Sequence, residues 1–526
     1  MAIVTVPELL AERAATFGDH PAIVDGETTL SYRELDEMTL AVGAGLLRLG
    51  ILPGDRVGIW APNSARFVLA LLGVQRIGAS VVPLNSRYRG YEAHDILARS
   101  RATAIVVADG FLGTDYVGML QNAGEGAAGS PVPGLPHLRA IIDITDSGRA
   151  DTTRWSDVVS VTDDDVEHAR MRGAEVTGSM LSDILFTSGT TGRPKGVMTT
   201  QRQTIGIGRT WARGASLTPE DRYAIVSPFF HGFGYKAGVV AALTAGSTIY
   251  PVVTFDPVQL MELVQTQRIT VMPGAPTIFL TLIDHPRLSE FDLSSLRYAT
   301  AGATSVPETL FEQMRDVLGF EVAAQAYGLT ECMVATQSRP DDDPRHIAQT
   351  TGPAVEGIEI RVVDPSGQDV AVGIDGEVWL RGESVMIGYF EDPEATAAAI
   401  DSEGWLRTGD VGRLDEHGCL KITDRMKDMI IVGGFNVYPA EVENVVSAHP
   451  DVIESAVVGV ADDRLGMVPR AFVVPRSGAS VAMEDIGAWC RTRLANFKVP
   501  REFVVVDALP RNASGKILKR ELRSGS

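Results

Sequence analysis

The chain has 526 residues, of which 45% are hydrophobic and 22% charged. A single hydrophobic core stops growing at roughly 250–300 residues, so this length predicts at least two domains. The 47 Lys and Arg residues against 67 Asp and Glu residues give a formal net charge of −20. A field of that sign repels nucleic acid and anionic membrane surfaces, which argues against both as partners.

Targeting and membrane segments are not indicated by the sequence. Residues 1–20 lack the basic start and the long apolar core of a secretory signal. The longest uncharged stretch, residues 237–255, is interrupted by Gly, Thr, Ser and Pro, and it predicts a buried helix, turn and strand. We therefore expect a cytoplasmic protein without a membrane span.

The three cysteines lie far apart, at Cys332, Cys419 and Cys490. They form neither a CxxC pair nor a Cys/His spacing typical of zinc, and so small a number suits a reducing compartment. We expect all three to be small core residues.

Residues 1 to about 180 alternate helices with short apolar strands. Apolar residues recur at helical spacing in residues 6–17 and 31–50, whereas residues 55–62, 79–85 and 102–109 are Val- and Ile-rich runs ended by Pro, Asn or Asp. This alternation predicts a mainly parallel sheet covered by helices.

The same alternation continues to about residue 350. Strands are predicted at residues 222–230, 247–253, 269–276 and 296–304, and helices at residues 257–268 and 307–319. A second helix-covered sheet is therefore expected.

Beyond about residue 352 the pattern changes to short alternating strands joined by Asp and Gly turns, in residues 358–364, 376–382 and 419–425. The last hundred residues contain enough helix and strand for a compact α+β domain. The predicted fold class is α/β, with a large N-terminal domain of helix-covered sheets plus a small β-rich unit, residues 1–424, and a mobile α+β C-terminal domain, residues 425–526.

One loop carries clear chemistry. In DILFTSGTTGRPKGVM, residues 183–198, a buried strand is followed by TSGTTGRPKG. Its glycines allow backbone N–H groups to approach a ligand closely, its hydroxyls add donors and its lysine adds a positive charge, a combination that suits a polyphosphate. The spacing does not match the Walker A pattern. The polar and glycine residues are Thr187, Ser188, Gly189, Thr190, Thr191, Gly192, Lys195 and Gly196.

The order of these ten residues resembles the signature loop of the adenylate-forming superfamily, which includes acyl-CoA synthetases, adenylation domains of peptide synthetases and beetle luciferases. The resemblance extends over roughly residues 10–522. It implies that ATP is bound and that an acid is activated as an acyl-adenylate.

Further signatures agree with the loop. AYGLTE, residues 326–331, resembles the second signature of the superfamily. The resemblance implies that Tyr327 lies along the adenine beside Gly328, that Thr330 contacts the α-phosphate and that Glu331 helps to hold Mg²⁺, which prefers oxygen ligands. ATAGAT, residues 299–304, resembles the wall of the adenine and acyl pocket. The wall residues assigned to nucleotide binding are Gly302, Ala303 and Thr304.

Two later motifs resemble the ribose and hinge segments of the superfamily. GWLRTGD, residues 404–410, implies that Asp410 accepts both ribose hydroxyls, for which a carboxylate is well suited. ITDRMKDMIIVGGFNVYPAEVE, residues 422–443, implies that Arg425 reaches the ribose and that Lys427 is the hinge. Gly433 and Gly434 then belong to the loop that meets the pantetheine of CoA.

LPRNASGKILKREL, residues 509–522, resembles the C-terminal signature, with Lys516 at its catalytic lysine. Adenylation drives a carboxylate oxygen against an α-phosphorus already surrounded by negative charge, so a cation is needed where charge builds up. With Lys516, the resemblance implies Thr187 and Glu331 as catalytic residues.

SPFFHGFGYKAG, residues 227–238, bears on the substrate. Members that activate amino acids carry an Asp here, whereas this chain has His231, so a substrate ammonium group has no partner. We expect His231 and Phe233 to line the acyl pocket, and we hypothesise that Tyr235 or Lys236 contacts a polar group of a cyclic substrate. The alternative is that Lys236 extends to the surface.

This segment also resembles actinobacterial CoA ligases that act on the bicyclic indanone propanoate left by steroid-ring breakdown. The leading hypothesis is an acid–CoA ligase that uses Mg²⁺, ATP and CoA and acts on a cyclic steroid-derived propanoate or a fatty acid. The alternatives are an acyl-AMP ligase that loads a carrier protein, a medium-chain fatty-acid CoA ligase and a non-catalytic nucleotide-binding protein. The intact Lys195, Glu331, Asp410, Arg425 and Lys516 argue against the last. The oligomeric state stays open.

Overall fold

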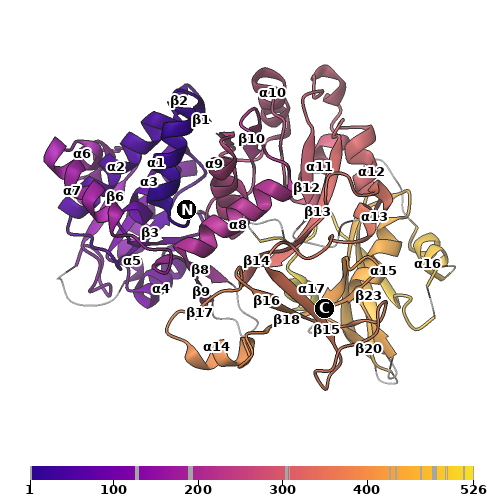
Figure 1. Cartoon of the computed structure of the whole chain (residues 1–526). Coiled ribbons are helices and arrows are strands. Elements are labelled where there is room, and N and C mark those ends of the chain that lie inside the picture. Colours follow the sequence, from indigo (N-terminus) through magenta and orange to yellow (C-terminus); the bar gives the residue numbers. More distant parts are fainter. Residues whose placement is uncertain are drawn as a thin grey trace.

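The structure is a computed structural model. It describes residues 3–124, 130–187, 194–302, 306, 308–425, 428–432, 435–462, 465–476, 482–491, 493–494, 496–512 and 516–524. Figure 1 shows a first lobe in indigo and purple, a second lobe beside it in magenta and rose, the orange helix α14 at the bottom, and the yellow C-terminal residues at the right.

The first lobe is built on an eight-stranded sheet. Its strands run parallel from β8 to β7, and β9 and β17 extend the other edge in antiparallel fashion. In spatial order the strands are β17 (Gly388–Tyr389), β9 (Lys195–Thr200), β8 (Leu181–Thr187), β4 (Ser80–Pro83), β3 (Arg56–Trp60), β5 (Ala104–Val107), β6 (Ala140–Asp143) and β7 (Thr153–Arg154).

Helices cover both faces of this sheet. Alternate strand residues point to opposite faces, so Val57 and Ile59 share a core with α2 and α3, whereas Ile105 and Val107 share one with α4 and α5. The helices of this lobe are α1 (Val6–Phe17), α2 (Tyr32–Arg48), α3 (Ala65–Arg76), α4 (Gly90–Ser100), α5 (Tyr116–Ala123), α6 (Trp155–Val159) and α7 (Asp163–Ala174), with the 3₁₀ turn η1 (Phe111–Gly113). The predicted helix-covered, mainly parallel sheet is confirmed.

The second lobe contains a four-stranded and a three-stranded sheet. Single parallel bridges through Val271 connect the two sheets. The strands are β10 (Arg222–Ile225), β11 (Thr248–Pro251), β1 (Pro21–Asp25) and β2 (Thr28–Ser31), and then β12 (Tyr298–Ala301), β13 (Val322–Leu329) and β14 (Cys332–Gln337). The helices are α8 (Gln201–Gly214), the π-helix η2 (Phe233–Val240), α9 (Ala241–Ala245), α10 (Pro257–Gln267), α11 (Pro276–Ile283), the 3₁₀ turn η3 (Leu288–Glu290), α12 (Glu308–Asp316) and α13 (Pro344–Gln349).

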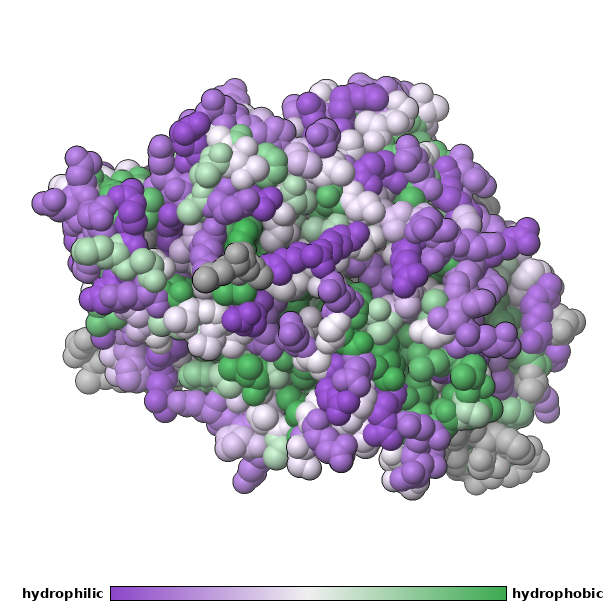
Figure 2. Space-filling view, viewed as in Figure 1, coloured by the Kyte–Doolittle hydropathy of each residue, from purple (hydrophilic) through white to green (hydrophobic). Residues whose placement is uncertain are grey.

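The small β-rich unit is an antiparallel sheet of four strands with one helix beside it. Figure 2 shows that hydrophilic residues cover most of the visible face, while hydrophobic residues gather below its centre, over this unit. Its elements are β15 (Ile358–Val363), β16 (Gly376–Gly382), β18 (Leu406–Leu414), β19 (Leu420–Arg425) and α14 (Pro393–Ala399).

The residues after 430 form a five-stranded sheet with helices, and they have hydrophobic clusters of their own. The elements are β20 (Ile430–Val432), β21 (Phe435–Val437), β22 (Val452–Asp462), β23 (Gly466–Pro475), β24 (Glu502–Val505), α15 (Pro439–Ser447), α16 (Met483–Arg491) and α17 (Lys519–Ser524). The predicted α+β character of this region is confirmed.

One predicted strand is wrong. Residues 269–276 make only isolated bridges, at Val271 and Gly274, because Pro273 between them has no N–H to donate to a ladder. Residues 237–255 do form the expected buried helix, turn and strand, and all three cysteines are buried and unpaired by disulfides. Within the described ranges, no helix is both long and apolar enough to cross a membrane.

Candidate active site

The glycine-rich loop leaves β8 and returns along β9. These strands are antiparallel neighbours, with Thr187 directly opposite Lys195, so both ends of the loop meet at one end of the sheet. The predicted phosphate-binding residues inside the loop lie outside the described residues. They are Ser188, Gly189, Thr190, Thr191 and Gly192.

Lys195 and Glu331 both contact Tyr389. The Lys195 ammonium lies 4.9 Å from the centroid of the Tyr389 ring, and the Tyr389 hydroxyl donates to Glu331 Oε1 at 2.8 Å. Burial and the nearby Glu331 carboxylate raise the pKa of Tyr389 above its usual value. The sequence analysis missed Tyr389, because only the pairing of β17 with β9 brings it to the loop.

The β13–β14 hairpin carries the second signature. Leu329 pairs with Cys332, so Thr330 and Glu331 form the turn between the strands. A side chain at Gly328 would place its Cβ 2.1 Å from the carbonyl oxygen of Met333, which is closer than atoms can approach. Glycine is therefore required for this turn to close.

Tyr327 and Asp410 are brought together from different sheets. The Tyr327 hydroxyl donates to Asp410 Oδ2 at 2.6 Å, and Asp410 is only 5% exposed. Burial, and then the Asp410 carboxylate, raise the pKa of Tyr327 well above its usual value. The backbone of Asp410 is paired across β18 and β19 with that of Arg425.

Of the remaining residues predicted for the nucleotide site and the hinge, one is described by the structure and the others are not. Gly302 follows β12 directly and lies beside β13, with its ideal Cβ position 3.8 Å from the Ala326 carbonyl oxygen. The other predictions of this group lie outside the described residues. They are Ala303, Thr304, Lys427, Gly433 and Gly434, together with the side chain of Arg425.

On the acyl side, His231 Nδ1 accepts a hydrogen bond from the Phe233 backbone N–H at 3.2 Å. Burial and the positive charge of Lys516 lower the pKa of His231 to about 4, so the imidazole is neutral at physiological pH. The neutral ring then carries its proton on Nε2, since Nδ1 is the acceptor. Lys516 is thus near enough to His231 for its charge to act there. The structure brings the C-terminal lysine to the acyl segment.

The structure contradicts both the hypothesis that Tyr235 or Lys236 contacts a polar group of the substrate and the alternative that Lys236 extends to the surface. Both side chains are 0% exposed, and the Lys236 ammonium forms an ion pair with Asp183 Oδ1 at 2.9 Å and donates to Thr199 Oγ1 at 2.7 Å. Lys236 therefore neither extends to the surface nor contacts substrate. Tyr235 donates to Asp183 Oδ2 at 3.3 Å in the same network, whereas Phe233 stays half-buried.

Comparisons with known proteins show the family of this chain. The family model described as AMP-binding enzyme matches residues 10–390, and the model described as AMP-binding enzyme C-terminal domain matches residues 441–516. The 3-[(3aS,4S,7aS)-7a-methyl-1,5-dioxo-octahydro-1H-inden-4-yl]propanoyl:CoA ligase of Rhodococcus jostii is 46% identical, with 99% of this chain and 98% of that protein covered. The ligase of the same name from Mycobacterium tuberculosis is 45% identical, with 99% and 98% covered.

The solved structure of the anthranilate CoA ligase AuaEII in complex with anthranoyl-AMP superposes with a TM-score of 0.86 at 25% identity, and the match covers 99% of this chain and 96% of that one. The matched family models and the two long relatives span nearly the whole chain. The chain belongs to the AMP-binding enzyme family, the adenylate-forming superfamily whose signatures its sequence carries.

Proposed function

We propose that this protein is an AMP-forming acid–CoA ligase that acts on a bicyclic propanoate derived from a steroid ring system. The acid and ATP give an acyl-adenylate and pyrophosphate, and the thiol of CoA then displaces AMP to give the thioester. The identity of 46% and 45% to two ligases named for such an indenyl propanoate, over nearly the full length, carries the proposal for the acid.

The first half-reaction uses residues from both lobes. Tyr327 lies along the adenine, Asp410 accepts the ribose hydroxyls, and Lys195 neutralises phosphate charge beside Thr187 and Thr330. Support for a common site comes from the Tyr327–Asp410 hydrogen bond and from the Lys195–Tyr389–Glu331 contacts.

A magnesium ion belongs to this proposal. The Glu331 carboxylate, held by the Tyr389 hydroxyl at a turn beside Thr330, supplies the oxygen donors that Mg²⁺ prefers, and phosphate oxygens complete such a set. When bound, the ion neutralises charge on the phosphates and on the departing pyrophosphate. Glu331 holds it, and Tyr389 orients Glu331.

Lys516 supplies positive charge where it develops in the transition state of adenylation. Its charge reaches His231, at the acyl side of the site. The Lys516 backbone N–H donates to Asn512 Oδ1 at 2.9 Å, and the Asn512 N–H donates to the Lys516 carbonyl oxygen at 2.9 Å, which fixes the turn that presents the lysine.

For the second half-reaction, the domain formed by residues 425–526 turns on the domain of residues 1–424 about Lys427. Gly433 and Gly434 then meet pantetheine in place of Lys516. The separate hydrophobic clusters after residue 430 support two bodies. The exposed pair between Arg476 and Asp284, at 3.1 Å, crosses between them, and such a pair contributes only about 0–1 kcal/mol.

The acyl segment suits an acid without an ammonium group. His231 is neutral, and no carboxylate is supplied by the neighbouring Phe229, Phe230 or Phe233. We also propose a cytoplasmic location, which the three cysteines without disulfides support.

The identity of the preferred acid is tested in a competition assay. Purified protein with Mg²⁺, ATP and CoA is given an equimolar mixture of medium- and long-chain fatty acids, aryl acids and bicyclic steroid-derived propanoates, and each acyl-CoA is measured by mass spectrometry. We expect the bicyclic propanoyl-CoA to dominate. Dominant straight-chain thioesters would identify a fatty-acid ligase instead, and adenylates without thioester would identify an acyl-AMP ligase that loads a carrier protein.

The Tyr327–Asp410 hydrogen bond gives a second prediction. Tyr327→Phe keeps an aromatic ring for the adenine but removes the donor that orients Asp410. A hydrogen bond to a charged group contributes about 1.5–3 kcal/mol, so we expect KM for ATP to rise about 10-fold or more, with a smaller change in kcat. Steady-state kinetics with ATP varied measures both parameters.

Tyr389→Phe is the matched control, because it removes the corresponding hydroxyl from Glu331. It is expected to raise the Mg²⁺ concentration needed for half-maximal rate. Identical kinetic changes in the two variants would contradict separate ribose and metal roles.

A further inference from the structure

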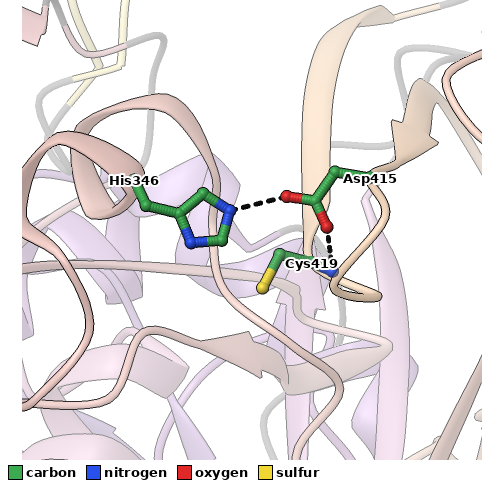
Figure 3. A group of neighbouring side chains, drawn as sticks. All are labelled: His346, Asp415 and Cys419. Carbon is green, nitrogen blue, oxygen red and sulfur yellow. Dashed lines mark hydrogen bonds and ion pairs between the residues drawn. The ribbon is translucent and has the colours of Figure 1, made fainter.

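A cluster of potential metal ligands lies on α13 and the β18–β19 turn. It consists of His346, Asp415 and Cys419 (Figure 3), and one ligand atom from each residue lies within 4.8 Å of the others. His346 Nε2 is 2.6 Å from Asp415 Oδ2. Cys419 is buried, and the other two residues are partly exposed, so the cluster lies just below the surface.

The turn holds the Asp415 carboxylate in a fixed direction. Asp415 Oδ1 accepts the backbone N–H groups of His417 and Cys419, each at 2.9 Å, and the Asp415 N–H donates to the Cys419 carbonyl oxygen at 3.0 Å. Oδ1 therefore anchors the turn, while Oδ2 faces His346. The same turn places the Cys419 thiol beside this second oxygen, as Figure 3 shows.

The helix that carries His346 is anchored as well. Its N-cap Asp343 accepts from the Arg345 N–H, and Gln325 Nε2 donates to the carbonyl oxygens of Ile347 and Ala348, each at 2.9 Å. The imidazole and the turn are thus presented by two separately braced elements. A braced arrangement loses little conformational entropy when a ligand binds.

The donor set selects a class of metal. Imidazole nitrogen and thiolate sulfur suit Zn²⁺ and its neighbours in the first transition row, whereas Mg²⁺ and Ca²⁺ prefer oxygen alone. Zinc bonds of about 2.0–2.3 Å in tetrahedral geometry separate ligand atoms by roughly 3–4 Å. To bind the ion, the 2.6 Å separation of His346 and Asp415 would therefore widen and the longest separations would shorten, each by about 1 Å.

A candidate for a fourth ligand lies on the same turn, outside this group of three. The His417 ring lies edge-on to the His346 ring, with 5.5 Å between centroids, and His417 is exposed on the same turn. We propose that His346, Asp415 and Cys419 form a Zn²⁺ site with His417 as the fourth ligand. This site is distinct from Glu331 and does not depend on the proposed substrate.

Zinc at this site ties together two elements that carry nucleotide residues. Gln325, which braces α13, lies on β13 two positions before Tyr327, and β18 carries Asp410 before it reaches Asp415. Bound metal is therefore expected to stabilise the fold of this region, because a ligand that binds only the native state shifts unfolding to higher temperature.

The test uses the full chain after treatment with a chelator, without nucleotide. Cobalt(II) is titrated as a spectroscopic probe, and we expect one ion per chain, with the visible bands of tetrahedral cobalt and an ultraviolet thiolate charge-transfer band. Zinc should then displace the cobalt, and it should raise Tm by about 5 °C.

Variants assign the ligands. Cys419→Ser is expected to abolish the charge-transfer band, and His346→Ala and the exposed His417→Ala each to weaken zinc binding at least about 10-fold. Cys490→Ser, which removes another buried thiol, and His137→Ala, which removes an exposed imidazole elsewhere, should leave the cobalt spectrum unchanged. Cobalt bound without a thiolate band, an unchanged band in Cys419→Ser, or no binding to the folded native chain would each overturn the proposal.

Discussion

Lys516→Ala is expected to lower the rate of acyl-adenylate formation by about 10²–10³-fold, while the conversion of supplied acyl-adenylate into acyl-CoA stays nearly unchanged. The charge of Lys516 is already strong enough at His231 to help lower the pKa of that imidazole. In the proposed mechanism, the same charge stabilises the transition state in which a carboxylate oxygen approaches the α-phosphorus. Once AMP is attached to the acid, the attack of the CoA thiol on the acyl-adenylate does not require the charge of Lys516.

The two half-reactions are measured separately. Pyrophosphate release with acid and ATP reports the first half-reaction, and thioester formation from synthetic acyl-adenylate and CoA reports the second. Arg520→Ala is the matched control, because it removes an exposed cation from the same C-terminal segment. An equal loss of both rates in Lys516→Ala would contradict the two-arrangement mechanism, whereas an equal loss in Arg520→Ala would show that the segment tolerates no change of charge.

Much of the fold was predictable from local patterns. Strands such as β3 and β5 are short apolar runs with clear ends. Helix α1 begins at Val6, directly after the N-cap Thr5, which forms a capping box with Glu8, a strong local signal. The strand expected near Val271 was not predicted correctly. Pro273 interrupts pairing only if a neighbouring strand would accept a hydrogen bond from an N–H at that position, and the sequence does not show which strands are neighbours.

The site was predictable only in part. Contiguous signatures placed Tyr327, Glu331 and Asp410 in one nucleotide site, and the structure brings the first and last of these within hydrogen-bond distance. Tyr389 lies in no such signature, and its contact with Glu331 arises from sheet pairing.

The cysteines show the same limit for metal ligands. Sequence spacing does not connect His346 with the other ligands, because it lies 69 positions before Asp415 and only the packing of α13 against the β18–β19 turn brings the two together. Proximity across distant segments is a property of tertiary structure, which a spacing rule does not contain.

Lys236→Met is expected to lower the free energy of unfolding by about 3–5 kcal/mol, because it leaves the Asp183 carboxylate buried without its counter-charge. Both partners are 0% exposed, and among the described residues Asp183 then keeps the hydroxyl donors of Thr199, Thr204 and Tyr235. Burial lowers the pKa of Lys236, while Asp183 opposes that shift and favours the ammonium.

Urea denaturation, followed through the transition of the N-terminal domain, measures this loss. Arg268→Ala is the matched control, since it breaks an exposed ion pair with Asp292 and should cost about 0–1 kcal/mol. The double variant Lys236→Met with Asp183→Asn should recover part of the stability, because removing both charges leaves no buried ion. A loss of under about 1 kcal/mol in Lys236→Met would show that the pair is not a desolvated ion pair.

The position of this pair also predicts how Lys236→Met changes catalysis. Asp183 lies on β8, which leads into the glycine-rich loop, and Lys236 lies on the π-helix whose first turn carries Phe233, two residues after His231. The ion pair therefore fixes β8 against the π-helix that follows His231. Loosening it should lower kcat for all acids by a similar factor, since Lys236 contacts none of them. The competition assay on the folded variant checks this, and a changed order of acid preference would mean that Lys236 shapes the acyl pocket after all.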